Sequence, residues 1–137
     1  MTYKAVIDTN VIISALLTGN ADSATLKVLN YVADGKIIPL LNEAILKEYS
    51  EVLHRAKFKF EETHISDILN LFLEMGEWPE PIKSTELLPD PKDVIFYEIS
   101  LSSSEAYLVT GNIKHFPLST KIVTPAQMVQ IIGLTER

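Results

Sequence analysis

The chain has 137 residues, of which 47% are hydrophobic and 22% are charged, and its formal net charge is −6 at pH 7. This length predicts a single domain over residues 1–137, and the absence of cysteine excludes disulfides, thiolate catalysis and cysteine-ligated metals. No apolar run approaches the roughly 20 residues of a membrane span and no secretory leader is recognisable, so we expect a cytoplasmic protein without membrane partners. The negative charge argues against general nucleic-acid affinity unless a cation or a local basic patch offsets it.

The first predicted element is a buried strand that stops at a carboxylate. Ala5, Val6 and Ile7 form a continuous apolar run, which is typical of a central parallel strand. Asp8 follows at the carboxyl end of this strand, where open α/β sheets bind ligands. Asp8 could equally cap the short helix predicted over 11–17, so both roles stay open from the residues alone.

The next elements are a helix capped by Ser23 and ended by Gly35, a strand over 37–41, and a helix from Asn42 to about Lys57. In the last of these, Glu48 lies on the flank of the apolar stripe, so it is the acid of this helix that can reach a shared site. A flanking glutamate is more often a solvated boundary residue. The stripe consists of Ile45, Tyr49, Val52, Leu53 and Ala56.

Basic and aromatic residues alternate after this helix. Arg55, Lys57 and Lys59 are interleaved with Phe58 and Phe60, which indicates either an edge that contacts phosphate or a solvated turn anchored by its aromatics. A further helix is predicted over 63–76, with Ile65, Ile68, Leu69, Phe72 and Leu73 on its apolar face.

The Asp90-Pro91-Lys92-Asp93 segment opens a helix predicted to run to Leu101, and its pattern can be explained entirely as a helix start. A buried strand over 107–110 then ends at Gly111-Asn112. A short strand over 122–123 and a helix over 125–132 complete the chain.

Short strands separated by helices predict an α/β fold, with a parallel sheet of about five strands covered by helices on both faces and the first strand central. In such a sheet, Asp8, Glu48, Asp93 and Asn112 can converge at the carboxyl edge. Clustered carboxylates repel one another and attract a hard divalent cation, for which Mg²⁺ or Mn²⁺ is best suited.

Four segments in this order together resemble a PIN domain, and the resemblance covers essentially the full chain. It is similar to the bacterial PIN group of toxin–antitoxin toxins. The segments are Asp8-Thr9-Asn10 with the apolar run after it, Glu48 to Leu53, Asp90 to Asp93, and Leu108 to Asn112 followed by Lys114-His115-Phe116.

The resemblance implies a metal-dependent ribonuclease with a three-layer α/β/α fold and a sheet order of 3-2-1-4-5. Its near-constant acids fall on Asp8, Glu48 and Asp93, which would bind Mg²⁺ or Mn²⁺ and carry out phosphodiester hydrolysis. Residues that would orient these ligands and their waters are Thr9, Asn10, Thr110 and Asn112.

The family commonly carries a fourth acid where this chain has Asn112. An asparagine contributes no charge, so a second cation should bind weakly. Candidate RNA contacts are Arg55, Lys57, Lys59, Lys114 and His115. The resemblance also implies a homodimer and a separate antitoxin chain that holds the toxin inactive.

Two other function classes remain open. A catalytically inert PIN-like module that binds RNA or a protein is favoured by Asn112. An acid-cluster phosphatase would use Asp8 as nucleophile but expects a second aspartate where Asn10 stands. Neither a phosphate-binding glycine loop nor a dinucleotide fingerprint follows the first strand.

Overall fold

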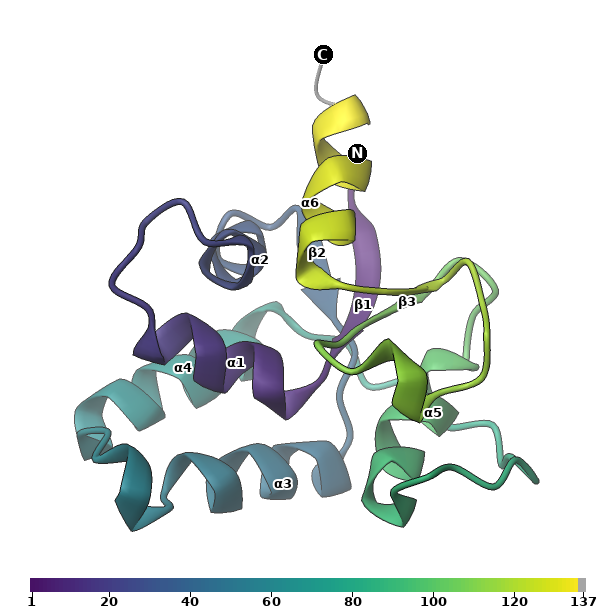
Figure 1. Ribbon diagram of the computed structural model, residues 1–137, viewed down its shortest axis with the longest axis horizontal. Helices are drawn as coiled ribbons and strands as arrows, with labels where there is room; N and C mark the ends of the chain where they lie inside the picture. The colour runs from purple at the N-terminus through teal and green to yellow at the C-terminus, as the bar shows by residue number, and fades with distance from the viewer. Residues whose placement is uncertain (136–137) are drawn as a thin grey trace.

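The structure is a computed structural model that describes residues 1–135 of the chain (Figure 1). Its elements, in chain order, are β1 (Tyr3–Ile7), α1 (Thr9–Leu17), α2 (Ala24–Ala33), β2 (Ile37–Pro39), α3 (Glu43–Leu53), the 3₁₀ turn η1 (Ala56–Phe58), α4 (Glu62–Met75), the 3₁₀ turn η2 (Pro91–Asp93), α5 (Val94–Ser100), β3 (Tyr107–Val109), the 3₁₀ turn η3 (Ile113–His115), β4 (Ile122–Val123) and α6 (Pro125–Thr135).

The sheet is parallel, and its strand order is β2-β1-β3-β4. Ala5 of β1 lies opposite Pro39 on one side and Tyr107 on the other. The prediction of a central first strand is therefore confirmed. Asp8 and Thr110 directly follow β1 and β3, so both stand at the same carboxyl edge of the sheet.

The sheet has four strands within the described residues, where about five were expected, and the strand that the expected order places beyond β2 is the one that does not form. Beyond β2 the described residues form one parallel bridge, between Leu40 and Glu77, instead of a ladder. The Glu77 amide donates to the Pro39 carbonyl over 3.0 Å, and Pro79, two residues further on, has no N–H with which to continue the ladder. Gly76 permits the close approach to β2, because a Cβ there would lie 3.0 Å from the Pro39 carbonyl oxygen.

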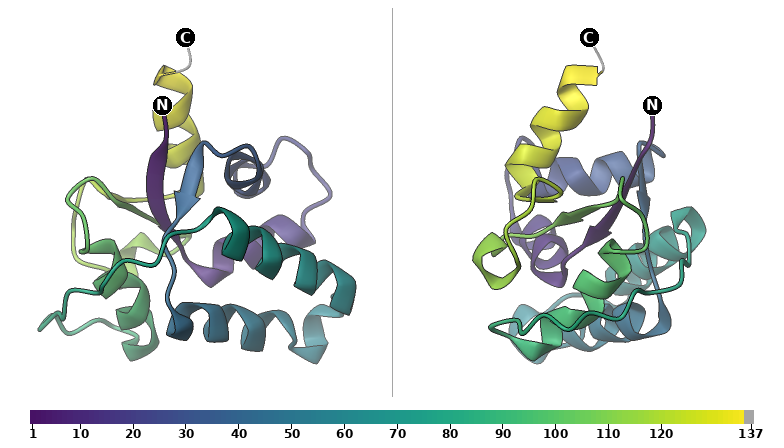
Figure 2. Two further views of the ribbon diagram at one scale, coloured as in Figure 1. Left: turned by 180° about the vertical axis from the view of Figure 1, so that it is seen from behind. Right: turned by 90° about the vertical axis from the view of Figure 1, so that its right-hand side faces the viewer.

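Helices cover both faces of the sheet, which gives the three-layer α/β/α arrangement. Figure 2 shows α1, α2 and α6 grouped on one side of the strands and α4 on the other, with α3 and α5 below the carboxyl edge. No helix within residues 1–135 has the length and apolar character needed to cross a membrane.

The predicted caps are present. The Ser23 hydroxyl accepts from the Leu26 amide and the Asn42 side chain accepts from the Ile45 amide, over 3.3 and 2.8 Å. Gly35, with φ of +79°, follows the end of α2 in a conformation that favours glycine.

Two predicted helix boundaries are wrong. The helix expected to reach Lys57 ends at Leu53, because Arg55 is extended (φ −62°, ψ 128°) and breaks the helical path before η1. Ala56 is consequently exposed and leaves the apolar stripe. The helix expected from Asp90 to Leu101 begins instead as the 3₁₀ turn η2 and becomes α-helical only over Val94–Ser100.

The core joins the sheet to the helices through large aromatic side chains. Ala5, Val6 and Ile7 are fully buried, as their apolar run predicts. Tyr49 packs edge-on against Phe72 of α4 at 5.4 Å between ring centroids and also contacts Phe96 of α5. Of the face predicted for the fourth helix, Leu73 is 47% exposed, so it lies outside the core.

Candidate active site

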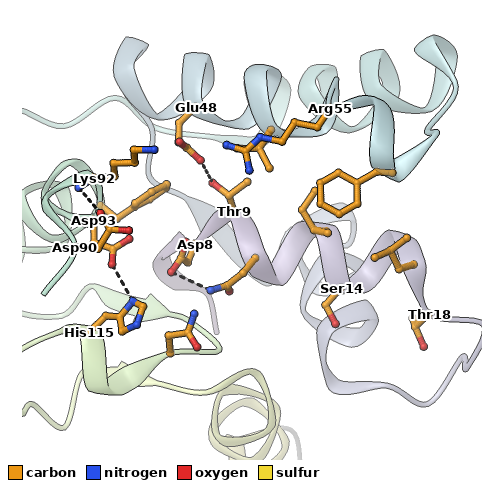
Figure 3. Close-up of a pocket in the computed structure, with 17 residues that line it drawn as sticks. Asp8, Thr9, Ser14, Thr18, Glu48, Arg55, Asp90, Lys92, Asp93 and His115 are labelled. Atoms are coloured by element: carbon orange, nitrogen blue, oxygen red, sulfur yellow. Dashed lines mark hydrogen bonds and ion pairs between the residues drawn. The ribbon is translucent and has the colours of Figure 1, made fainter.

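A pocket of about 680 Å³ opens at the carboxyl edge of the sheet, between α1, α3, η2 and η3 (Figure 3). Four carboxylates line it, and three of them, which come from three separate parts of the fold, are called the acidic cluster below: Asp8, Glu48 and Asp93. The other lining residues are Thr9, Asn10, Ile13, Ser14, Leu17, Thr18, Val52, Arg55, Phe58, Asp90, Lys92, Phe96, Asn112 and His115.

Asp8 is the most buried member of the acidic cluster, at 6% exposure. Asp8 stands at the N-cap position of α1 without a side-chain capping hydrogen bond, although the backbone amides of Thr9 and Asn10 lie close enough to lower its pKa. The Thr110 hydroxyl donates to Asp8 Oδ2 over 2.7 Å. The oxygen of the same hydroxyl accepts from the backbone N–H of Asn112 over 3.0 Å. Burial raises the pKa of Asp8 from 3.8 to about 6, and the charge of Asp93 adds to this rise.

Glu48 is held in place from α1. The Thr9 hydroxyl donates to Glu48 Oε2 over 2.9 Å, and Thr9 itself is buried. The next residue along α3, Tyr49, donates from its hydroxyl to the carbonyl oxygen of Ile7. The flank position predicted for Glu48 therefore places it in the pocket, with its carboxylate tied to the residue that follows Asp8.

Asp93 pairs with His115 across the pocket. His115 Nδ1 lies 3.2 Å from Asp93 Oδ2, and the Asp93 side chain is 14% exposed. Burial raises the pKa of Asp93, the hydrogen bond from His115 opposes this rise, and the charge of Asp90 adds to it. His115 thus acts here as a hydrogen-bonding partner of an acid.

The structure brings most of the predicted site residues together and leaves three out. Thr110 lies buried behind Asp8, and Asn10 donates to Asp8 Oδ2 over 3.4 Å. The lysines at positions 57, 59 and 114 do not line the pocket. The residues that do line it are Asp8, Thr9, Asn10, Glu48, Arg55, Asp93, Asn112 and His115.

Sequence reasoning missed Lys92, which lines the pocket between the two aspartates of its turn. Its position next to Asp93 in the Asp90-Pro91-Lys92-Asp93 segment could have indicated that Lys92 lies at the pocket. In the view of Figure 3, Lys92 and Arg55 flank Glu48. Neither cation forms an ion pair within residues 1–135, so both are available to an anionic ligand.

The donor chemistry of the acidic cluster fits a hard divalent cation, because every donor is a carboxylate oxygen. In the part of the chain that the structure describes, no group of three or more His, Asp or Glu side chains is placed so that it could hold a metal ion. Magnesium is commonly held by one or two carboxylates, with waters and a substrate phosphate completing its shell. The acidic cluster fits such an open site and does not form a closed cage.

Comparison with known proteins agrees with this geometry. No curated protein and no solved structure matches the chain. The PIN domain family matches it over residues 4–114, a stretch that contains all of β1 but its first residue, the whole acidic cluster and the edge after β3. The chain therefore belongs to the PIN domain family, whose members are in general metal-dependent nucleases.

Proposed function

We propose that the protein is a Mg²⁺- or Mn²⁺-dependent ribonuclease that hydrolyses RNA phosphodiester bonds in the pocket of the acidic cluster. One observation carries the proposal: the carboxylates of Asp8, Glu48 and Asp93 come from three separate parts of the fold and line one open pocket, together with two cations that form no ion pair within residues 1–135. Carboxylates supply ligands for a divalent cation, and Arg55 and Lys92 supply contacts for phosphate.

Asp8 and Asp93 would hold the cation. A bound divalent cation stabilises negative charge on a phosphate oxygen and lowers the pKa of a water molecule. Thr110 directs its hydroxyl proton toward Asp8 and thereby keeps that carboxylate oriented as an acceptor. His115 orients Asp93 in the same way from the other side of the pocket.

Glu48 would accept a proton from the attacking water. It is only partly buried, and the Thr9 hydroxyl binds its Oε2, so the second carboxylate oxygen is left for the water. Arg55 and Lys92 would contact the phosphates of the bound strand. Because Lys57, Lys59 and Lys114 lie outside the pocket, we expect them to add only general attraction for RNA.

An inert PIN-like binding module is the second candidate, and Asn112 is the observation that favours it. Asn112 lines the pocket where the family commonly carries a fourth acid, and an amide adds no negative charge. This module would bind RNA or a protein partner without cutting.

We further propose that this ribonuclease is the toxin of a toxin–antitoxin pair and acts in the cytoplasm as a homodimer. Its support is the sequence resemblance to that bacterial PIN group. The acidic pocket is also open to a basic side chain from a separate antitoxin chain, which would neutralise the acidic cluster. Growth arrest on expression of the wild-type chain, absent for Asp93→Asn, would support the toxin role.

The nuclease proposal is tested by incubating single-stranded and structured RNA with the purified protein, in Mn²⁺, in Mg²⁺ and in a chelator. Asp93→Asn is prepared identically, and Asp67→Asn is the matched control, because Asp67 is an exposed aspartate of α4 that does not line the pocket. Cutting that requires metal, is lost in Asp93→Asn and survives in Asp67→Asn is the expected result. Mn²⁺ binding without cutting would instead support the inert module.

A further inference from the structure

Two hollows adjoin one another at the end of the sheet that lies away from β2, where β4 is the edge strand. Their volumes are about 230 and 170 Å³. Four residues line both hollows: Pro117, Leu118, Ser119 and Ile122. Because the hollows share these residues, they form one continuous surface, which is called the β4 face below.

The β4 face exposes three aliphatic side chains. Leu118 is fully exposed, Ile113 is 40% exposed and Leu101 is 38% exposed. Leu101 lines one hollow, Ile113 lines the other and Leu118 lines both, so the three side chains belong to one patch. Single exposed apolar side chains are normal at a protein surface, whereas a contiguous group beside an edge strand is typical of a surface that a partner covers.

The charge of the β4 face is opposite in sign to that of the whole chain. Among the described residues that line the two hollows, the charged ones are Lys114 and Lys121. Neither lysine forms an ion pair within residues 1–135. Lys121 Nζ lies 4.4 Å from the ring centroid of Tyr107, which holds its ammonium group beside β3. In a chain with 18 acidic residues and 12 lysines and arginines, this local excess of positive charge favours a negatively charged ligand.

A protein segment fits the β4 face better than a nucleic acid does. The exposed apolar side chains, Leu101, Ile113 and Leu118, are aliphatic, so none of them offers a ring on which a base can stack. Aliphatic side chains pack well against the aliphatic side chains of another protein, and carboxylates pair with lysines at the rim of such contacts. The ligand that combines both features is an acidic segment with leucine or isoleucine side chains.

The β4 face adjoins the candidate active site through η3 without being part of it. Ile113 and Lys114 of η3 line a hollow of the β4 face, whereas His115, the last residue of η3, lines the pocket of the acidic cluster. The two surfaces require opposite charges, since the acidic cluster attracts cations and the β4 face attracts carboxylates. A segment bound at the β4 face would therefore contact η3 from outside the pocket.

We propose that the β4 face is a docking site for an acidic segment of a protein partner. The leucine or isoleucine side chains of the segment fill the two hollows on either side of Leu118, and its carboxylates pair with Lys114 and Lys121. This inference does not rest on the proposed ribonuclease function, because it concerns a surface outside the pocket.

Selection from random peptides tests the chemistry of the segment without assuming its sequence. Short random peptides displayed on phage are passed over the immobilised full chain, and the bound peptides are sequenced. We expect them to combine aspartate or glutamate with leucine or isoleucine. The peptide that is most enriched is then synthesised with a fluorescent label, and its Kd is measured by fluorescence anisotropy.

Leu118→Ser should raise the Kd of that peptide by roughly tenfold, because truncation of a central interface residue typically has an effect of this size. The matched control is Leu87→Ser. Leu87 is also almost fully exposed, and it lines neither hollow. The control should leave the Kd unchanged, and both variants should fold, since each changes an exposed side chain.

Lys114→Glu should raise the Kd by roughly fivefold, as expected for one exposed ion pair. Its matched control is Lys83→Glu, an exposed lysine that lines neither hollow. A peptide in which lysine replaces each acidic residue should bind Lys114→Glu more tightly than it binds the wild-type chain. This exchange of charges separates a direct pairing from a general loss of affinity.

Three results would overturn the docking site: no enrichment of acidic peptides with aliphatic side chains, a Kd that Leu118→Ser leaves unchanged, or an equal effect of Leu118→Ser and Leu87→Ser. Sedimentation of the chain alone tests the remaining occupant. A wild-type oligomer that becomes monomeric with Leu118→Ser would assign the β4 face to a second copy and would also overturn the proposal. The nuclease proposal fails separately, because a chain that binds the peptide and cuts no RNA retains the docking site and loses the ribonuclease.

Discussion

The hydroxyl of Tyr49 donates a hydrogen bond to the carbonyl oxygen of Ile7, and each residue is the chain neighbour of a pocket carboxylate. Glu48 precedes Tyr49 on α3, and Asp8 follows Ile7 at the end of β1. Both bonded residues are fully buried. This single bond therefore ties the helix that carries one acid to the strand that carries another.

Replacing Tyr49 with phenylalanine removes this bond while keeping the ring. The Ile7 carbonyl loses a buried donor, so the free energy of unfolding should fall by about 1–3 kcal/mol, measured by urea denaturation. The cleavage rate should also fall, because the separation of Glu48 and Asp8 is no longer fixed.

Tyr3→Phe is the control for that change. The Tyr3 hydroxyl also makes one hydrogen bond, to Thr135, but at the exposed surface. Its loss should cost less than about 0.5 kcal/mol. Equal losses in the two variants would contradict the role assigned to the Tyr49 bond.

Asp8→Asn should stabilise the protein in the absence of metal. Burial raises the pKa of Asp8 to about 6, so above that pH the folded state holds a carboxylate that is better solvated when unfolded. The unfolded state loses its proton first, and stability therefore falls as pH rises from 3.8 to about 6. The variant should be more stable by up to about 3 kcal/mol at pH 7, since one pKa unit is about 1.36 kcal/mol.

The same variant should show no such gain near pH 3, where Asp8 is protonated in both states. Thermal denaturation in a chelator at both pH values checks the prediction. A stability gain that is equal at both values would show that the ionised carboxylate is not the cause.

His115→Ala should shift the pH dependence of cleavage. The hydrogen bond from His115 lowers the pKa of Asp93, so its removal should raise that pKa further and move the acidic limb of the rate profile to higher pH. His54→Ala is the control, because His54 is exposed and pairs with Glu62 outside the pocket. Matching profiles for the two variants would argue against a functional Asp93–His115 pair.

Asn112→Asp should strengthen metal binding. The side chain lines the pocket, and an added carboxylate increases the negative charge there. Calorimetric titration with Mn²⁺ should show tighter binding or a second bound ion, compared with Asn70→Asp, a control of equal charge on the exposed surface of α4 and outside the pocket. Unchanged Mn²⁺ binding in Asn112→Asp would mean that position 112 does not face the cation.

The carboxyl edge of the sheet can be predicted from the sequence, because the apolar runs that indicate it are local patterns. The apolar runs before Asp8 and Thr110 are continuous, and a parallel sheet places both ends at one edge, which the structure confirms. Helix periodicity singles out Glu48 as the acid of its helix that can reach a shared site without excluding a solvated boundary position, and the structure places it in the pocket.

The pairings inside the site could not be predicted, because they depend on loop paths. The pairing of His115 with Asp93 joins η3 to η2, and no periodic pattern relates these turns. The helix end at Leu53 escaped prediction for a similar reason. The residues after it carry no glycine or proline, and the break comes from the extended backbone of Arg55.

We propose that water hydrolyses the RNA in a reaction that depends on a bound cation. The chemical form of the phosphate on the new RNA ends tests this proposal most directly. Attack by water leaves a linear phosphate on one new end and a hydroxyl on the other, whereas attack by the RNA's own 2′-hydroxyl leaves a cyclic phosphate. We predict linear phosphate ends in Mn²⁺ or Mg²⁺ and intact RNA in a chelator, read by mass spectrometry. Cyclic phosphate ends, or cutting that persists in the chelator, would contradict the account.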